Sequence, residues 1–310
     1  MDIRVAGQVL VLFILIALGF LSYKLKITTK EASVYFSSFA MKITLPCMIF
    51  SSFLRPFSQE LLGEAITTLG VAFFVYSFTL LVGLAYPHIL RIKGPERGVH
   101  RYAIFISNTG LIGMPVIEAI LGPLYLFHAA IFSVPANILS FSVGAWLVAK
   151  EGKKPMAFSW KIFITPLSIT TVAGFIVFLF SIRLPGPLEQ SIRLAGGVTT
   201  PLAMAVVGIS IAHADIKQLL GRWRIYITAL VRLLVIPALV GLACFLAGIR
   251  GPLLMLPVIL AAMPAGSTTS LFASVYDVAV EEAGSILALT IVLSAATIPL
   301  VIIVLHYFAG

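Results

Sequence analysis

Two stretches of this 310-residue sequence place amide and hydroxyl side chains beside glycine and proline, inside segments that are otherwise apolar. The first stretch contains Asn108, Thr109, Gly110, Gly113 and Pro115. The second contains Pro264, Ala265, Gly266, Ser267, Thr268 and Thr269. Glycine lowers helix propensity and proline removes a backbone donor, so each stretch predicts an interrupted helix. Backbone N–H groups at such breaks, together with these side chains, would suit a carboxylate ligand.

These residue types also have an ordinary structural explanation. Glycine and proline are common in membrane helices, and Ser and Thr hydroxyls often bond to carbonyls of their own helix. Exposed backbone inside a bilayer is tolerated only beside a cavity or within protein. Because the two breaks occur in corresponding apolar segments, we favour a binding site between them over two unrelated kinks.

Three charged side chains fall inside apolar segments. Lys42 and Arg232 lie about ten residues into their segments, which is roughly 15 Å at 1.5 Å per residue. Either could anchor an anion, or could snorkel or form an internal ion pair, for which Glu118 is the nearest acid. Glu118 could instead exchange a proton. Pro46 and Pro201 are expected to bend or loosen the helices beside the breaks.

The composition excludes an ordinary soluble domain. Hydrophobic residues make up 60% of the chain and charged residues 11%, with a mean hydropathy of +1.09, whereas soluble domains carry about 25% charged residues. The formal net charge of +9 lies mainly in short loops, where topology and anionic lipid headgroups explain it better than nucleic acid does. The five histidines are scattered, so we expect no metal site and no cofactor, and both cysteines are expected to be free thiols.

At about 20 residues per crossing, the hydropathy pattern predicts ten transmembrane helices. They lie near residues 5–23, 32–54, 65–90, 101–121, 125–149, 161–182, 194–212, 223–248, 253–276 and 283–308. The loops on one side carry fourteen Lys and Arg residues, and those on the other side carry five. The positive-inside rule therefore predicts a multi-pass cell-membrane protein with a cytoplasmic central loop and both termini outside, extracellular or periplasmic.

The two halves of the sequence resemble each other at an offset of about 155 residues, at which Pro46 corresponds to Pro201 and Gly110 to Gly266. Five spans per half is an odd number, so the second copy must cross the membrane in the opposite sense. We therefore predict a first five-helix repeat over 1–150, a cytoplasmic linker over 151–155 and an inverted repeat over 156–310. This arrangement would bring the breaks in helices four and nine together near the membrane midplane.

Sequence motifs narrow the classes of function. The sequence has no G-x-x-x-x-G-K-[ST], no H-E-x-x-H and no G-x-S-x-G, which argues against an ATP-driven pump and a membrane hydrolase. A secondary active transporter of small organic anions, such as di- or monocarboxylates, explains the matched breaks best. The alternative is a membrane-embedded carboxylate sensor without net transport. An enzyme is not expected, because buried acidic residues are scarce.

Several segments resemble motifs of a known family. Asn108-Thr109-Gly110-Leu111-Ile112-Gly113-Met114-Pro115, Pro264-Ala265-Gly266 and Phe272-Ala273-Ser274-Val275-Tyr276-Asp277 resemble the auxin efflux carrier family. Leu287-Ala288-Leu289-Thr290 is similar to part of its last span. This family includes plant PIN-type carriers and bacterial malate and malonate permeases. The similarity extends over essentially the whole chain.

This resemblance implies an all-α fold of two inverted five-helix repeats with crossed broken helices four and nine, similar to bile-acid and sodium/proton transporters. It also implies a scaffold made of the first, second, sixth and seventh spans, with elevator-like alternating access. Asn108 would be the crossover asparagine that meets the substrate carboxylate, and Pro115 and Pro264 the helix-breaking prolines. Because Ser107 replaces a proline of the plant motif and the central loop is short, the chain looks more like prokaryotic permeases for small carboxylates. A homodimer is compatible with this resemblance.

Overall fold

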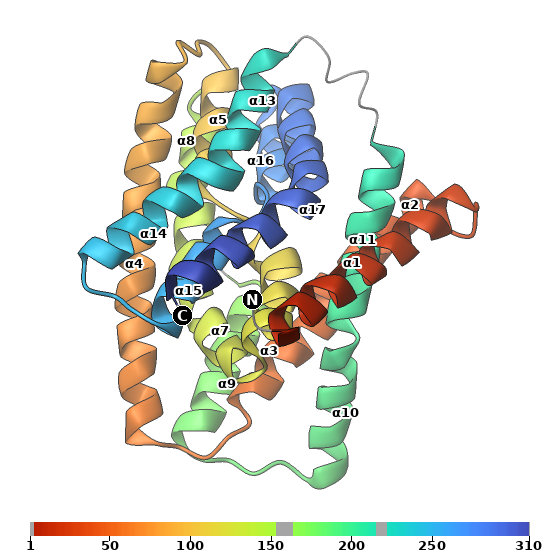
Figure 1. Cartoon of the computed structure of the whole chain (residues 1–310), viewed down its shortest axis with the longest axis vertical. Coiled ribbons are helices and arrows are strands. Elements are labelled where there is room, and N and C mark those ends of the chain that lie inside the picture. Colours follow the sequence, from red (N-terminus) through yellow and green to blue (C-terminus); the bar gives the residue numbers. More distant parts are fainter. Residues whose placement is uncertain (1–2, 153–163, 215–221, 310) are drawn as a thin grey trace. The chain divides into compact units, whose positions relative to one another are not determined.

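The computed structural model describes residues 3–152, 164–214 and 222–309, and these residues form a series of helices joined by short connections (Figure 1). The first half contains α1 (Ile3–Lys24), α2 (Lys30–Phe39), η1 (Ala40–Thr44), α3 (Leu45–Phe53), α4 (Gln59–Ile89), α5 (Glu96–Phe105), η2 (Thr109–Gly113), α6 (Met114–Leu121), α7 (Leu124–Leu139), η3 (Ser140–Gly144) and α8 (Ala145–Ala149). The second contains α9 (Pro166–Leu179), α10 (Gly186–Gly197), α11 (Thr199–His213), α13 (Trp223–Leu230), η5 (Val231–Val235), α14 (Ile236–Leu246), α15 (Pro252–Ala261), α16 (Thr268–Tyr276) and α17 (Val280–Ala309).

Within these described ranges, seven helical stretches are long and apolar enough to cross a bilayer. Two shorter apolar helices, Thr109–Leu121 and Pro166–Leu179, lie between them. Many of their large hydrophobic side chains are exposed, as expected where lipid replaces water as the solvent. The chain is therefore a polytopic, all-helical membrane protein over the residues described.

Prolines coincide with local widening of several helices. The π-helical turns η1, η2 and η5 each end two residues before a proline, at Pro46, Pro115 and Pro237 respectively. A proline lacks an N–H group and clashes with the carbonyl four residues earlier, and a wider turn relieves both problems without ending the helix. Pro201 has a different position, in the first turn of α11, just after the single non-helical residue that separates α10 from α11.

Contacts between α-carbons divide the chain into two compact units. Unit 1 comprises Met1–Gly70, Gly110–Val134 and Phe163–His213, and unit 2 comprises Val71–Thr109, Pro135–Ile162 and Ala214–Gly310. Each unit combines segments from both halves of the sequence. The predicted repeats, 1–150 and 156–310, divide the chain by topology rather than by contacts, so they remain a prediction. Of the predicted linker, residues 153–155 lie outside the described residues.

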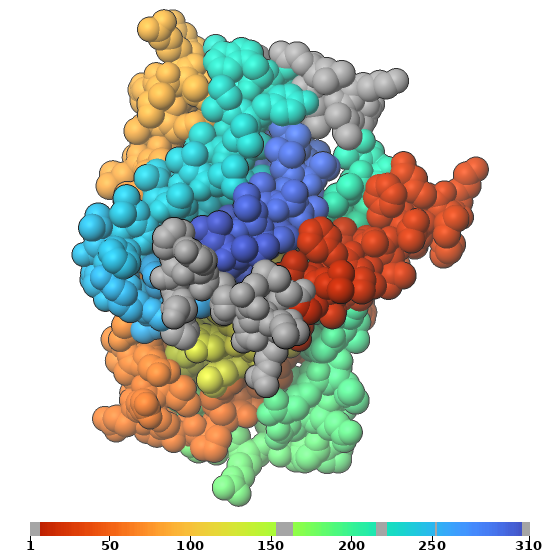
Figure 2. Space-filling view, in the orientation of Figure 1, coloured from red at the N-terminus to blue at the C-terminus, as the bar shows by residue number. Residues whose placement is uncertain are grey.

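Small residues allow close helix packing in unit 1. Figures 1 and 2 show α1, in red, crossing α11, in green. A Cβ atom on Gly208 would lie 2.0 Å from Ile16 O, and one on Gly19 would lie 2.2 Å from Ala205 O. Glycine at both positions therefore lets the two backbones approach as membrane helices do at small-residue interfaces.

Unit 2 is assembled around α5, α8, α13, α16 and α17. Helix α5 packs on α8, where a Cβ on Gly98 would lie only 2.6 Å from Leu147 O. Helix α13 packs on α17 and α14 on α15. This packing holds the two non-helical segments that follow α5 and α15.

Candidate functional site

Two non-helical segments meet in unit 2, and we call this pair, residues 106–108 and 262–267, the crossover. The first separates α5 from η2 and the second separates α15 from α16. Ser107 and Ala265 form an antiparallel β-bridge. The Asn108 N–H group donates to Pro264 O at 2.8 Å, and the Gly266 N–H group donates to Ile106 O at 3.0 Å. Each break therefore satisfies backbone groups of the other, as open backbone within a membrane requires.

The crossover depends on close approach at Gly266 and on a threonine of α17. A Cβ on Gly266 would lie 3.1 Å from Ile106 Cγ2 and 3.2 Å from Thr268 Oγ1, so a larger residue would require these side chains to shift. The Ala265 N–H group donates to Thr290 Oγ1 at 3.3 Å, and this hydroxyl donates in turn to Leu287 O. Helix α17 thus supplies a hydrogen-bond acceptor to the backbone of the second break.

The predicted amide side chain is buried and unused by the protein. Asn108 is 7% exposed, and its side-chain amide makes no hydrogen bond to any residue in the described ranges. A side-chain amide presents two donors and an acceptor. The Asn108 amide thus offers hydrogen-bonding groups beside the crossover that no described residue uses.

The predicted hydroxyl groups of the second break have different surroundings. Thr268 Oγ1 accepts a 2.6 Å hydrogen bond from the Tyr102 hydroxyl, which also contacts Ser140 Oγ. Thr269 Oγ1 is buried and has no partner among the residues described, while Ser267 is half-buried at the start of α16. In the first turn of α16, the Thr269 N–H group donates to Gly266 O at 2.9 Å, and the other N–H groups of this turn have no earlier helical carbonyl to bond. The Thr268 hydroxyl is thus hydrogen-bonded within the protein, whereas the Thr269 hydroxyl has no hydrogen-bond partner among the described residues.

Arg232 is a buried cation without an acidic partner in unit 2. Its side chain lies in η5, is 1% exposed, and donates from Nη1 to Ile104 O at 3.3 Å. Its Nε has no partner, and no carboxylate of the described chain pairs with it. The Tyr76 phenol faces both Arg232 and Thr109. An unpaired guanidinium in the interior is strongly disfavoured, so this position would attract an anion next to the crossover.

The other predicted residues belong to unit 1. Lys42 is exposed on η1 and makes no ion pair within the described ranges. Glu118, on α6, accepts a 2.7 Å hydrogen bond from Thr200 Oγ1 of α11. Gly110 faces Leu45, whose Cδ2 lies 3.6 Å from the position of an added Cβ. Asn108, Thr109, residues 264–269 and Arg232 therefore lie together in unit 2. Lys42, Gly110 and Glu118 belong to unit 1.

The first break lies nearer the N-terminus than its proline suggests. Gly113 ends η2, and Pro115 is the second residue of α6, whereas the non-helical backbone is at 106–108. Pro264, in contrast, lies within its break. Sequence reasoning also missed Tyr76 and Tyr102, which the apolar pattern does not distinguish from other aromatic residues. Thr290 had a signal, since it belongs to a segment that resembles the last span of the family.

The chain is similar to membrane transporters over nearly its whole length. A family model described as membrane transport protein matches residues 4–302. A protein of Rhizobium meliloti (strain 1021), named "Putative malonate transporter", is 25% identical over 305 residues, which cover 95% of this chain and 94% of that protein. A protein of Methanothermobacter thermautotrophicus, named "Uncharacterized transporter", is 23% identical over 300 residues, which cover 96% of this chain and 97% of that protein.

Proposed function

Because this chain belongs to the auxin efflux carrier family of membrane transport proteins, we propose that it is a secondary active transporter of a small organic anion. Malonate is the first substrate to test, since a relative matched over nearly its full length carries that name. The proposed ligands are Asn108, Thr109, the backbone and hydroxyl groups of residues 264–269, and Arg232.

The unpaired Arg232 guanidinium carries this proposal. It is buried, it has no carboxylate partner among the described residues, and the Tyr76 phenol beside it also lies near Thr109, the neighbour of Asn108 in the sequence. A substrate carboxylate would supply the missing negative charge, while Asn108 and the first-turn amides of α16 would donate hydrogen bonds. These groups together favour an anion over a cation or a neutral solute.

The fold proposed for this function is a pair of inverted five-helix repeats. The helices allow five crossings per half, with η1, η2, η3 and η5 as wide turns inside crossings. The predicted scaffold spans, which correspond to α1, α2 to α3, α9, and α10 to α11, all fall in unit 1. Both breaks fall in unit 2. This distribution supports an elevator-like mechanism, in which the part that holds the crossover moves against a fixed scaffold, with the termini outside and the central loop in the cytoplasm.

Counterflow in proteoliposomes tests the proposal. Vesicles that contain purified protein and unlabelled malonate should accumulate external labelled malonate, and Asn108→Ala should abolish this uptake while the protein remains folded. Asn137→Ala is the matched control, because Asn137 is the only other asparagine in the chain and lies on α7, outside the crossover. Binding of malonate without counterflow would instead identify a carboxylate sensor. Normal uptake by Asn108→Ala would refute the site.

A further inference from the structure

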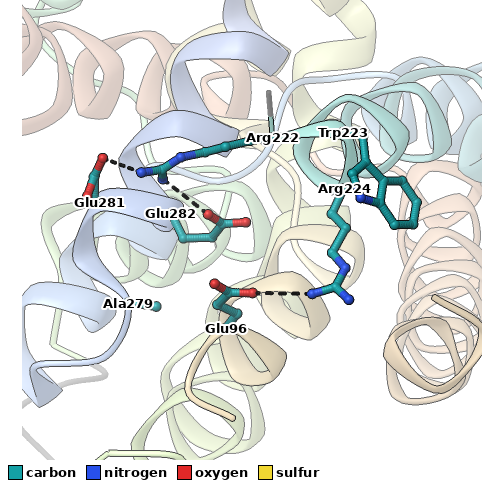
Figure 3. Close-up of a pocket in the computed structure, with 7 residues that line it drawn as sticks. All are labelled: Glu96, Arg222, Trp223, Arg224, Ala279, Glu281 and Glu282. Atoms are coloured by element: carbon teal, nitrogen blue, oxygen red, sulfur yellow. Dashed lines mark hydrogen bonds and ion pairs between the residues drawn. The ribbon is translucent and has the colours of Figure 1, made fainter. Parts of the chain in front are cut away.

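The N-terminal ends of α5, α13 and α17 surround a polar cavity in unit 2, away from the crossover end of α5. The cavity has a volume of about 460 Å³ and is lined by Glu96, Arg222, Trp223, Arg224, Ala279, Glu281 and Glu282 (Figure 3). His100 lies one turn along α5 from Glu96 and contacts Glu282. Neither the transport proposal nor the similarity to other proteins uses this cluster.

We infer that Glu96, His100 and Glu282 form a binding site for one divalent transition-metal ion of the Zn²⁺ type. Each offers a ligand atom, and these atoms all lie within 4.8 Å of one another. Glu96 and His100 are four residues apart, so both project from one face of α5. Imidazole nitrogen and carboxylate oxygen are standard zinc ligands at about 2.0–2.2 Å, and the 3.1 Å between His100 Nε2 and Glu282 Oε1 suits two ligands of one ion.

The surrounding hydrogen bonds match what a metal-bound histidine needs. A histidine that binds metal through Nε2 carries its proton on Nδ1 and donates it to a neighbouring group. His100 Nδ1 lies 2.7 Å from Thr228 Oγ1. The Thr228 hydroxyl can then accept this proton, because its own hydrogen has a second acceptor, Arg224 O, at 2.8 Å. His100 is fully buried, so this partner keeps the ring in place.

The carboxylates keep atoms available for a metal despite the neighbouring arginines. Glu282 turns Oε1 toward His100 and Oε2 toward Arg222 Nη1, at 3.3 Å. Figure 3 shows Arg222 between Glu281 and Glu282, and Glu96 opposite Arg224. The Glu96–Arg224 ion pair is long, at 3.9 Å, so Glu96 can turn to a metal at little cost.

The charge balance of the cavity favours a cation. Three carboxylates, Glu96, Glu281 and Glu282, face two guanidinium groups, Arg222 and Arg224. With a neutral imidazole at His100, the cluster keeps a negative charge that a bound metal ion would offset. The sequence did not indicate this site because His100 and Glu282 are 182 positions apart. A metal ion here would tie α5, which leads into the crossover, to the first turn of α17.

Zinc binding to the purified full-length protein tests this inference without any transport measurement. After chelator treatment, titration calorimetry with ZnCl₂ should show one saturable Zn²⁺ per chain, and X-ray absorption should show only nitrogen and oxygen ligands. Glu96→Gln and Glu282→Gln should each weaken binding by about tenfold or more. Glu281→Gln is the matched control, because Glu281 is exposed and pairs with Arg222 but is not a proposed ligand. It should weaken zinc binding much less than either ligand variant does, because it removes a neighbouring charge and no ligand atom.

Glu96→Gln is the decisive variant, because Glu96 is only half-buried and its replacement should leave folding intact. The inference is overturned if the wild type shows no saturable zinc binding, if Glu96→Gln binds as tightly as the wild type, or if the absorption spectrum shows a sulfur ligand. It is also overturned if thermal stability responds to pH but not to ZnCl₂, which would mean that the cluster binds a proton only.

Discussion

Replacing Arg232 with methionine should separate stability from transport. Arg232 is 1% exposed and makes one hydrogen bond of 3.3 Å, to Ile104 O. Losing a hydrogen bond from a charged group costs about 1.5–3 kcal/mol, but burying an ion without a partner costs several kcal/mol. The second effect is the larger, and methionine fills much of the same volume. We therefore expect the free energy of unfolding of Arg232→Met to equal or exceed the wild-type value, by up to about 3 kcal/mol.

The same change should strongly weaken malonate transport at low malonate concentrations. Removing one partner of a buried, hydrogen-bonded charge pair costs about 2–5 kcal/mol, and each 1.4 kcal/mol is about tenfold in an equilibrium constant. The half-saturation concentration for malonate counterflow should therefore rise by about 30-fold or more. The half-saturation concentration of Arg232→Lys should lie between those of the wild type and Arg232→Met, since lysine keeps the charge but lacks the planar fork of donors. Thermal unfolding is measured in detergent, and counterflow is measured after the same preparations are reconstituted into proteoliposomes.

Arg250→Met is the matched control, because Arg250 is exposed and its guanidinium contacts groups close in the sequence, the carbonyls of Phe245 and Ile249 and the Phe245 ring. It should leave both measurements unchanged. Wild-type counterflow in Arg232→Met would show that no anion binds beside Arg232. A loss of more than about 3 kcal/mol of stability, with normal transport by the folded fraction, would show that the guanidinium is structural.

Two further predictions concern unit 1. Gly208→Ala should destabilise the protein by about 1–3 kcal/mol, because its methyl group would clash with Ile16 O. Gly70→Ala is the control: nothing lies within 4 Å of the added Cβ, so the change should be neutral or stabilising by up to about 1 kcal/mol. Equal melting temperatures of the two variants would contradict the tight α1–α11 contact. If Glu118 carries a coupling proton, Glu118→Gln should keep malonate exchange but lose the malonate accumulation that an imposed pH gradient drives. Continued accumulation would exclude this role, and Glu118 would then be only a hydrogen-bond partner of Thr200.

The apolar segments and the two breaks could be predicted from the sequence because both depend on local chemistry. Long apolar runs specify membrane crossings wherever they occur, and glycine and proline oppose a regular helix whatever surrounds them. The helix ends were less predictable. The predicted spans 65–90 and 194–212 begin as helices at Gln59 and Gly186, because polar first turns such as the one with Glu189 extend helices beyond the apolar segment.

Only the tertiary structure shows which groups of the two breaks bond to each other and which charged side chains are buried near them. The similarity of the two halves predicted that the breaks meet, but the hydrogen bonds from Asn108 to Pro264 and from Gly266 to Ile106, which join positions more than 150 residues apart, could be identified only in the tertiary structure. The burial of Arg232 without an acid, and the meeting of His100 with Glu282, likewise depend on helices packed from distant parts of the chain. A side chain's residue type sets the chemistry it offers, but only packing decides whether its charge and hydrogen bonds are satisfied by the protein or left for a ligand.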